Sequence, residues 1–281
     1  MQLNKLTKSH LKTLIDWARN EGWNPGEFDY EVFWETDPDG FYGFFESDKL
    51  IAGGAIVSYN GKFGFMGLFI VHPDYRNKGL GRQLWFLRRD KLISRLDEGA
   101  SIGMDGVVAM QPFYSKGGFE IYYKDERYER LGEQFHISEF ISNIELKDFE
   151  LISAYDKKCF GFCRDDFLYN WLKMSNAKTF KYKGERSLMG FAVLRKVIEG
   201  YKIGPLFADN YNVAQELYKA CLNAAVGANV YLDIPMLNEN AVKLVKAFKA
   251  KYVFECARMY YNSPPEIEIN KLFGITTFEL G

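Results

Sequence analysis

The segment from Val71 to Gly81 constrains this chain more than any other part of its sequence. It joins a nearly all-apolar run, FGFMGLFIV at 63–71, to a leucine-rich stretch through the polar loop HPDYRNKG. A continuous apolar run is typical of a strand covered on both faces, so residues 63–71 are expected to form a central strand. Gly64 and Gly67 within it indicate a bulge, or a point where another backbone or a ligand comes close.

The loop before the predicted helix has the chemistry of a phosphate-binding site. A helix start offers unpaired backbone N–H groups and a partial positive charge, and both favour an anion. Gly79 and Gly81 let the backbone approach that anion closely, because glycine has no Cβ. Arg76, Lys78 and Arg82 add positive charge at the same point. The loop is neither a P-loop, which needs Gly-x4-Gly-Lys-Ser/Thr, nor a dinucleotide fingerprint, which needs a third glycine.

At these residues the sequence resembles the GCN5-related N-acetyltransferase (GNAT) superfamily. Its signature, Arg/Gln-x-x-Gly-x-Gly/Ala after a central strand, is matched by Arg76 to Gly81 at every fixed position. The resemblance implies binding of acetyl-coenzyme A, with the pyrophosphate on the loop amides and the pantetheine arm along the strand's main chain. The implied coenzyme-binding residues are Phe69, Ile70, Val71, Arg76, Asn77, Lys78, Gly79, Leu80, Gly81 and Arg82. A plain strand–turn–helix without a ligand is the alternative.

A second motif lies downstream, where PFYSKGGFE resembles the family's Tyr-x-x-x-Gly-Phe segment. The resemblance places Tyr114 where the family's general acid protonates the departing thiolate. A phenol with a pKa near ~10 is a reasonable proton donor to a thiolate with a pKa near ~8.5. The alternative role of Tyr114 is packing beneath the coenzyme. Many family members carry an asparagine seven residues before this tyrosine, and Val107 stands there instead.

The base that removes the amine's proton is less constrained. A carboxylate is the usual candidate, and Asp105 directly follows a predicted strand at 100–104 that is expected near the thioester. Glu21, Asp29 and Glu46 are rivals from the expected acceptor side. For each of these carboxylates, a solvated surface position is the alternative interpretation.

Turn residues divide the first half into short elements. A helix that Ser9 can cap is expected to end at Gly22, and Asn60-Gly61 predicts a hairpin because both residues tolerate positive φ. The strands expected in this half are 41–46, 50–59, 63–71, 100–104, 119–123 and 128–131. They would complete one α+β unit by about residue 135, near the usual domain size.

The second half repeats this order loosely, so the chain is expected to be an α+β protein of two tandem GNAT-type domains. The domains are expected at 1–137 and 138–281, each a mixed, mostly antiparallel sheet flanked by helices. The second half resembles the C-terminal domain of a two-domain, YitH-like subgroup of the family. That resemblance is carried by GPLFAD, YLDIPMLNENA, ARMYY and FGITTFELG.

The second domain departs from the family pattern where chemistry would occur. No Arg-x-x-Gly-x-Gly loop precedes its predicted helix at Asn212, and Phe248 stands where a tyrosine acid would lie. The domain is therefore expected to be degenerate, with a structural role or a role in covering or binding the acceptor.

Candidate acceptor-binding residues come from both halves. Trp23 and Asn24, within EGWNPG, lie in the region where family members build the acceptor site. Their alternative role is a helix-terminating turn packed by the indole. Asp233 and Asn238 are the polar candidates of the second half, and Asn238 is alternatively a helix cap.

Composition narrows the class of protein. The net charge of −1 lacks the basic excess of a nucleic-acid binder. No signal peptide or apolar run of ~18 residues is visible, so a cytoplasmic protein without membrane contact is expected. The four cysteines and three histidines show no metal-ligand spacing, and no metal is expected. Either a monomer or a homodimer is compatible with the sequence.

The expected function is transfer of an acetyl group from acetyl-coenzyme A to a primary amine of a small molecule, by direct attack. Two alternatives stay open. One is a non-catalytic acyl-coenzyme A sensor or interaction protein that keeps the loop without turnover. The other is an acyltransferase that uses a longer acyl chain, for which the 17% aromatic content would supply a lining.

Overall fold

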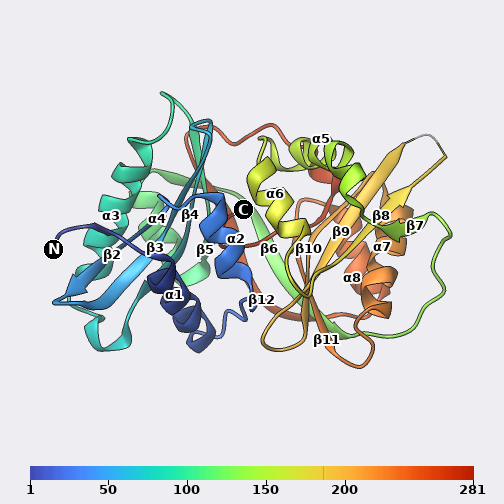
Figure 1. Cartoon of the computed structure of the whole chain (residues 1–281), viewed down its shortest axis with the longest axis horizontal. Coiled ribbons are helices and arrows are strands. Elements are labelled where there is room, and N and C mark those ends of the chain that lie inside the picture. The colour runs from blue at the N-terminus through green and yellow to red at the C-terminus, as the bar shows by residue number, and fades with distance from the viewer. Residues whose placement is uncertain (186) are drawn as a thin grey trace.

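The computed structural model describes residues 1–185 and 187–281 (Figure 1). The helices are α1 (Lys8–Asn20), α2 (Asp29–Thr36), α3 (Leu80–Ile93), α4 (Gln111–Lys116), α5 (Phe149–Phe160), α6 (Asp165–Leu172), α7 (Tyr211–Asn223) and α8 (Glu239–Ala247). The strands of the N-terminal half are β1 (Asn4–Lys5), β2 (Phe41–Glu46), β3 (Lys49–Tyr59), β4 (Phe63–Val71), β5 (Ser101–Val107) and β6 (Phe119–Leu131). Those of the C-terminal half are β7 (Ile141–Asn143), β8 (Lys178–Lys183), β9 (Leu188–Lys196), β10 (Tyr201–Ala208), β11 (Asn229–Pro235), β12 (Lys251–Tyr261) and β13 (Leu272–Gly274).

The two halves exchange strands in the middle of one continuous sheet. The strand order is β1-β2-β3-β4-β5-β12-β6-β11-β10-β9-β8-β7, with β13 paired to β10. The C-terminal half's β12 thus lies between β5 and β6, while the N-terminal half's β6 pairs with β11. The expectation that the first ~135 residues complete their own unit is therefore wrong, because β5 has its outer neighbour in the second half.

The predicted fold class is confirmed in its main features. Neighbouring strands are antiparallel except for the pairs β4–β5 and β10–β11, each of which is joined by a crossover helix, α3 or α7. Helices cover both faces of the sheet (Figure 1). In the N-terminal half, α1 and α2 pack on one face around Phe33, and α3 and α4 pack on the other around Trp85.

The interface between the halves is a continuous core. The ring of Phe33 on α2 stacks on Trp171 of α6, with centroids 6.4 Å apart. Asp29 and Arg195 form a wholly buried ion pair across the interface, with 3.1 Å between Oδ1 and Nε. Because a buried pair that is pulled apart leaves an uncompensated charge, these contacts fix the orientation of one half on the other.

Several local features differ from the sequence-based expectations. Thr7, not Ser9, caps α1, and its side chain accepts a hydrogen bond from the His10 backbone. The two strands expected at 119–123 and 128–131 form the single strand β6, because its long run pairs with both β12 and β11. The Asn60-Gly61 hairpin is confirmed, with φ of 52° and 73°.

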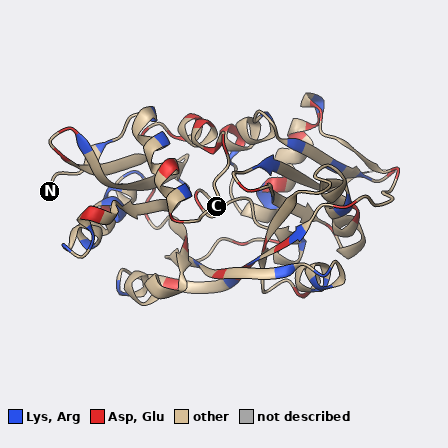
Figure 2. Cartoon of the chain, turned by 90° about the horizontal axis from the view of Figure 1, so that it is seen from below, with Lys and Arg blue, Asp and Glu red and all other residues tan. Residues whose placement is uncertain are grey.

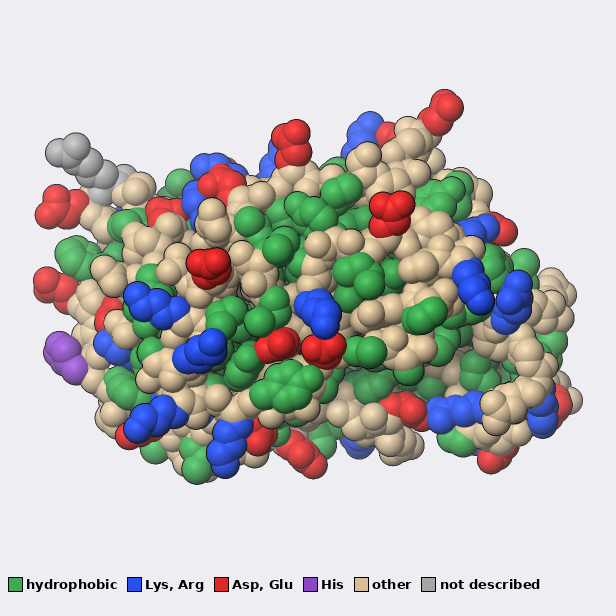
Figure 3. Space-filling model, turned by 180° about the vertical axis from the view of Figure 1, so that it is seen from behind, with side chains coloured by type: hydrophobic (Ala, Val, Ile, Leu, Met, Phe, Trp, Pro, Cys, Tyr) green, Lys and Arg blue, Asp and Glu red, His purple; other side chains and the backbone are tan. Residues whose placement is uncertain are grey.

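Charges of both signs are spread over the whole molecule. Both Lys or Arg and Asp or Glu occur in each half (Figure 2), and the face drawn in Figure 3 also carries both signs interspersed. This distribution fits the net charge of −1. Across the part of the chain that the structure describes, no helix has the length and apolar content that crossing a bilayer would require.

Candidate active site

The cleft begins where two parallel strands separate. β4 and β5 pair from Phe63 and Ser101 to Met66 and Met104, and no pairing follows. A register shift against β3 leaves an extra residue in β4 after Gly67, where Leu68 has a φ of 48°. This is the bulge that the glycines predicted, and it turns the end of β4 away from β5.

The opening is a cleft of about 810 Å³ that runs from the α3 loop to the C-terminal half. Its middle is apolar and is walled by the end of β4 on one side and by β5 and α4 on the other. The lining residues are Glu21, Gly22, Trp23, Met66, Gly67, Leu68, Phe69, Ile70, Val71, Tyr75, Arg76, Asn77, Gly81, Arg82, Met104, Asp105, Val107, Met110, Phe113, Tyr114, Arg127, Phe254, Cys256, Phe278 and Glu279.

The α3 loop lies at one end of the cleft with its helix start uncapped. Gly79 occupies the N-cap position with φ of 78°, and no side chain bonds to the first-turn N–H groups of α3. Arg76 donates from Nε to the carbonyl of Val71 at 2.9 Å and also forms an ion pair with Glu21. These free donors and the left-handed glycine suit a phosphate group.

The predicted coenzyme residues divide into two groups by position. Phe69, Ile70, Val71, Arg76, Asn77, Gly81 and Arg82 line the cleft. Lys78, Gly79 and Leu80 form the outer part of the loop: Lys78 donates to the carbonyl of Asp74 at 3.1 Å, and Leu80 packs near Leu84. Beyond Met66, the edge of β4 that faces the cleft has no strand partner among the described residues. The carbonyls of Gly67 and Val71 accept from Arg88 and Arg76, and the main chain between them can pair with an extended ligand.

Tyr114 lies on α4 and presents its ring to the same cleft. The ring stacks on Trp85 at 5.8 Å between centroids and lies against Gly106, where a Cβ would be 3.0 Å away from it. Burial raises the pKa of Tyr114 to about 12, against a smaller lowering by Arg88. The phenol is therefore protonated at neutral pH, as a proton donor must be.

Asp105 also lines the cleft, but Arg258 of β12 holds both of its oxygens. The two bonds are 2.7 Å from Nε to Oδ1 and 2.9 Å from Nη2 to Oδ2. Burial raises the pKa of Asp105 to about 6, although Arg258 opposes that shift. The pair exists only because β12 is exchanged into the N-terminal half, where Arg258 stands opposite Asp105.

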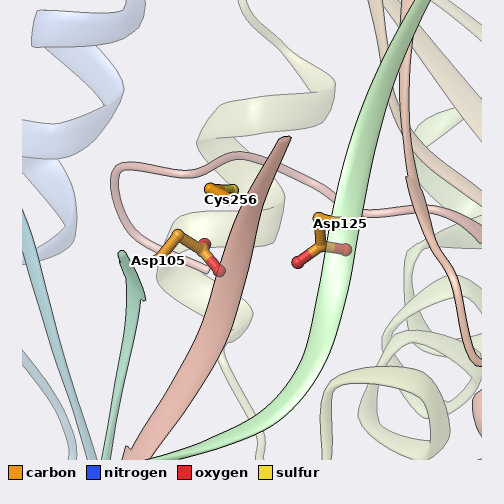
Figure 4. A group of neighbouring side chains, drawn as sticks. All are labelled: Asp105, Asp125 and Cys256. Atoms are coloured by element: carbon orange, nitrogen blue, oxygen red, sulfur yellow. The ribbon is translucent and has the colours of Figure 1, made fainter. Parts of the chain in front are cut away.

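Behind this pair lies a cluster of potential metal ligands that the sequence did not predict (Figure 4). Single ligand atoms of Asp105, Asp125 and Cys256 lie within 4.8 Å of one another. The carboxyl of Asp125 points toward Asp105 from β6, with β12 between them (Figure 4). Because the Arg258 guanidinium already occupies both Asp105 oxygens, we assign no metal to this cluster.

Asp125 is wholly buried, and neither carboxyl oxygen has a hydrogen-bond partner among the described residues. Burial, with Asp105 nearby, raises its pKa well above the usual value. The folded protein then keeps a proton that the unfolded chain releases near pH ~3.9, so stability falls as pH rises above that value.

Asp125→Asn is expected to be as stable as the wild type near pH 4 and more stable at pH 7. The gain at pH 7 should be about 1.4 kcal/mol for each pH unit between ~3.9 and either pH 7 or the folded-state pKa of Asp125, whichever is lower. Urea unfolding at both pH values measures it. An unchanged difference between wild type and variant across this range would show that Asp125 is not protonated in the folded protein.

The end of the cleft that Trp23 and residues of the C-terminal half line is called the acceptor end, because the sequence predicts the acceptor there. Trp23 lines it from the end of α1, and its carbonyl accepts from Lys202 Nζ at 3.0 Å. Arg127 lines it from β6 and holds Asp233 through two bonds of 2.6 and 2.7 Å. Phe254 lies against the Arg127 guanidinium, 4.7 Å from ring centroid to Cζ.

Three of the four predicted acceptor residues, Asn24, Asp233 and Asn238, do not line the cleft, and Asp233 is held in its ion pair with Arg127. Asn24 bridges the halves instead, with its side chain bonded to both backbone groups of Glu199 at 2.9 and 3.3 Å. Asn238 is wholly buried as the cap of α8, and its amide also donates to the carbonyl of Leu272 at 2.8 Å. The helix-cap alternative for Asn238 is therefore the one that the contacts support.

The rival carboxylates are engaged elsewhere. Glu21 lines the cleft but is paired with Arg76. Asp29 is buried in the pair with Arg195 at the interface. Glu46 accepts from the Tyr75 hydroxyl. None of the three is a free carboxylate at the acceptor end.

The C-terminal half has the same strand–helix–strand arrangement, but its opening is filled. β10 and β11 pair in parallel from Tyr201 to Ile203, after which β13 occupies the edge of β10. The α7 start is also occupied, because the Asn210 side chain accepts from the N–H groups of Asn212 and Val213. The strand edge and the helix start, which are both open in the N-terminal half, are thus occupied by residues of the chain itself in the C-terminal half.

The tail, defined as Leu272–Gly281, supplies cleft residues that the sequence did not reveal. Phe278 and Glu279 line the acceptor end beside Phe254 and Cys256 of β12. The only signal in the sequence is that FGITTFELG is largely apolar without a helical or strand period, which indicates a buried loop. The position of the tail in the fold depends on contacts with residues more than 200 positions away in the sequence. In one of them, the Tyr59 hydroxyl donates to the Leu280 carbonyl at 2.9 Å.

Comparisons with known proteins identify the family of both halves. The family model "Acetyltransferase (GNAT) family" matches residues 7–119, and "Acetyltransferase (GNAT) domain" matches residues 152–274. Holothin acyltransferase from Pseudoalteromonas sp. (strain SANK 73390) is 28% identical over 95% of this chain and 90% of its own. The uncharacterised N-acetyltransferase YitH of Bacillus subtilis (strain 168) is 24% identical over 83% of this chain and 82% of its own.

Solved structures show the same fold over the whole chain. A candidate acetyltransferase from Pyrococcus horikoshii superposes with a TM-score of 0.85 at 24% identity, covering 100% of this chain and 95% of its own. A tandem GNAT protein from the clavulanic acid biosynthesis pathway has a TM-score of 0.64 at 11% identity, covering 94% and 99%. The chain therefore belongs to the GNAT superfamily, with two such domains in tandem, and is an acyl-coenzyme A-dependent acyltransferase.

Proposed function

We propose that the protein transfers an acetyl group from acetyl-coenzyme A to the primary amine of a small molecule by direct attack. The observation that carries this is the cleft itself, which joins an uncapped helix start, a free strand edge and a buried phenol. The uncapped α3 start suits the pyrophosphate, and the free edge of β4 suits the pantetheine arm. This arrangement leads the thioester toward Gly67, at the point where β4 and β5 separate.

Tyr114 and the acceptor then act on opposite sides of the thioester. The amine nitrogen forms a bond to the acyl carbon, the carbon–sulfur bond breaks, and the departing thiolate takes the proton of Tyr114. The buried, apolar surroundings of Tyr114 keep its proton in place until a strong base forms beside it. Asp105 stays a candidate base, although it accepts a proton only in competition with Arg258.

The C-terminal half contributes in this proposal by completing the site. Its own opening is filled by β13, and the α7 start is capped. Through β12 and the tail it supplies Phe254, Cys256, Phe278 and Glu279 to the cleft. We place the coenzyme only in the N-terminal half for this reason.

The test is an amine panel incubated with acetyl-coenzyme A, followed by free thiol release. Thiol release that depends on an amine, with an N-acetyl product found by mass spectrometry, supports the proposal. Coenzyme A binding without turnover on any amine favours the sensor alternative. Faster turnover with longer acyl-coenzyme A substrates favours the other alternative.

Arg82→Gln is expected to weaken coenzyme A binding about 10-fold or more, because hydrogen bonds to charged groups contribute ~1.5–3 kcal/mol. Arg82 lines the phosphate end and makes no ion pair with any described carboxylate, so its charge is free for a ligand. Calorimetric titration with coenzyme A measures the change. Arg19→Gln, at an exposed position on α1, is the matched control and should bind as the wild type. Equal affinities in both variants would remove Arg82 from the coenzyme site.

A further inference from the structure

We infer that Glu279, carried into the cleft by the tail, binds the acceptor as an ammonium ion and takes its proton before attack. The inference rests on the proposed function and names a group for it that lies in the second half of the chain. It also narrows the acceptor to small apolar monoamines. Three observations support the inference: the contacts that hold the tail in place, the charges around Glu279 and the aromatic residues that line this end of the cleft.

The tail is held so that Glu279 lies at the apex of the cleft. A Cβ on Gly67 would be 1.9 Å from the Glu279 carbonyl oxygen, so the two backbones touch at the point where β4 leaves β5. Arg164 donates to the Gly281 carbonyl and to Thr276 Oγ1, each at 2.8 Å. The Ile275 N–H donates to the Asp233 carbonyl at 2.9 Å. Glu279 is thereby placed beside the expected thioester position.

Glu279 is the carboxylate at this end of the cleft that has no cation paired to it. Glu279 lines the cleft and is 5% exposed, and its carboxylate accepts a hydrogen bond from the Thr277 hydroxyl. Among the described residues it forms no ion pair, whereas Asp105 is held by Arg258. A carboxylate that is buried and unpaired is costly, and binding a cationic ligand removes that cost.

The charged groups that face Glu279 are largely neutralised by one another. Arg127 on β6 is bound to Asp233 on β11, and Arg258 on β12 is bound to Asp105 on β5. Lys202 on β10 faces the same region, and burial lowers its pKa to about 7. Its Nζ is directed to the Trp23 carbonyl at 3.0 Å. When Lys202 is neutral, the site therefore presents one net negative charge, that of Glu279, which fits one ammonium group.

The walls around this charge are aromatic. Trp23, Phe254 and Phe278 line the acceptor end, and Phe254 and Phe278 pack together with centroids 5.8 Å apart. Rings of this kind favour a flat or apolar ligand body. A second charge on the ligand would lose its water against these rings without gaining a partner, which costs free energy. A polyamine with several charges would leave all but one of them unpaired here. An arylalkyl monoamine satisfies both the charge and the walls.

Glu279 and Tyr114 together account for every proton and bond change in the reaction. The Glu279 carboxylate takes one proton from the ammonium, and the neutral amine forms the new carbon–nitrogen bond. The carbon–sulfur bond breaks, the thiolate takes the Tyr114 proton, and the phenolate takes the second proton from nitrogen. Glu279 returns its proton to solvent, so the products are the amide, coenzyme A and one proton.

The experiment compares the full-length wild type, Glu279→Gln and Asp105→Asn on two amines at pH 7. Glu120→Gln, at an exposed position on β6 outside the cleft lining, is the control. 2-Phenylethylamine is an ammonium at this pH, and aniline is already neutral. Glu279→Gln is expected to lose about 10²-fold or more in kcat/KM for 2-phenylethylamine and much less for aniline. Glu279→Asp should recover part of the loss, and Glu120→Gln should lose nothing. Raising the pH should raise the kcat/KM of Glu279→Gln for 2-phenylethylamine toward the wild-type value, because more of the amine is then neutral.

A binding measurement keeps the inference testable even without turnover. Calorimetry should show that 2-phenylethylamine binds the wild type at least 10-fold more tightly than Glu279→Gln. The uncharged analogue 2-phenylethanol should bind both proteins with similar affinity. Spermidine should bind more weakly than 2-phenylethylamine.

Equal losses of kcat/KM on both amines, or equal binding of 2-phenylethylamine to both proteins, would overturn the role of Glu279. A larger loss in Asp105→Asn than in Glu279→Gln would return that role to Asp105. Ammonium binding through Glu279 without thiol release would instead contradict only the proposed function.

Discussion

Tyr114→Phe is expected to lower kcat by about 10²–10⁴-fold, the usual contribution of a positioned general acid. The substitution removes only the hydroxyl, and no described residue forms a hydrogen bond with it, so the ring should keep its place on Trp85. Coenzyme binding should be unchanged. The measurement is kcat from thiol release at saturating substrates, together with the Kd of coenzyme A.

Tyr123→Phe is the matched control for this prediction. Its hydroxyl is also buried and unpaired, but Tyr123 lies outside the residues that line the cleft. It should keep the wild-type kcat. If Tyr114→Phe turned over as fast as this control, Tyr114 would be a packing residue, which is the alternative that the sequence left open.

Arg164→Ala is expected to lower the free energy of unfolding by about 3–5 kcal/mol, the usual cost of removing one partner of a buried ion pair. The Arg164 side chain is 0% exposed and makes two bonds to Asp156, of 2.7 and 2.8 Å. It also holds the tail at Thr276 and Gly281. Its loss leaves the buried carboxylate of Asp156 unpaired and frees the segment that carries Glu279.

Urea unfolding measures this effect, and Arg19→Ala at an exposed position should change stability by less than about 0.5 kcal/mol. Turnover at a temperature where Arg164→Ala is still folded should also fall, because the tail is less well held. A second variant, Arg164→Met with Asp156→Leu, should recover most of the stability, since no buried charge is left unpaired. A loss below about 1 kcal/mol in Arg164→Ala would contradict the proposed role of this pair.

The parts of the site that the sequence predicted are those built from consecutive residues. The strand 63–71, its bulge near Gly67 and the loop before α3 follow from local chemistry. An apolar run needs burial, and a glycine adopts the positive φ that a loop requires at residue 79. The position of Tyr114 came from a motif of similar length. Each of these interactions lies within a few residues along the chain.

The acceptor side could not be predicted in this way. Arg258 and Asp105 are far apart in sequence, and only the exchange of β12 brings them opposite each other. The same exchange turned the expected self-contained first unit into half of a shared sheet. In the second half, the sequence shows the missing loop, but it does not show that β13 fills the opening or that Asn210 caps the helix.

The sequence alone therefore predicted the glycine-containing loop before α3, the buried central strand and the α+β order of elements, because these depend on local propensity and the periodicity of apolar residues. The tertiary structure alone decided which carboxylates are paired and which is left free in the cleft. Ion pairing depends on strand register across the interface and on the close contact of the tail with Gly67. Such contacts are set by the packing of distant segments, which no local pattern of residues encodes.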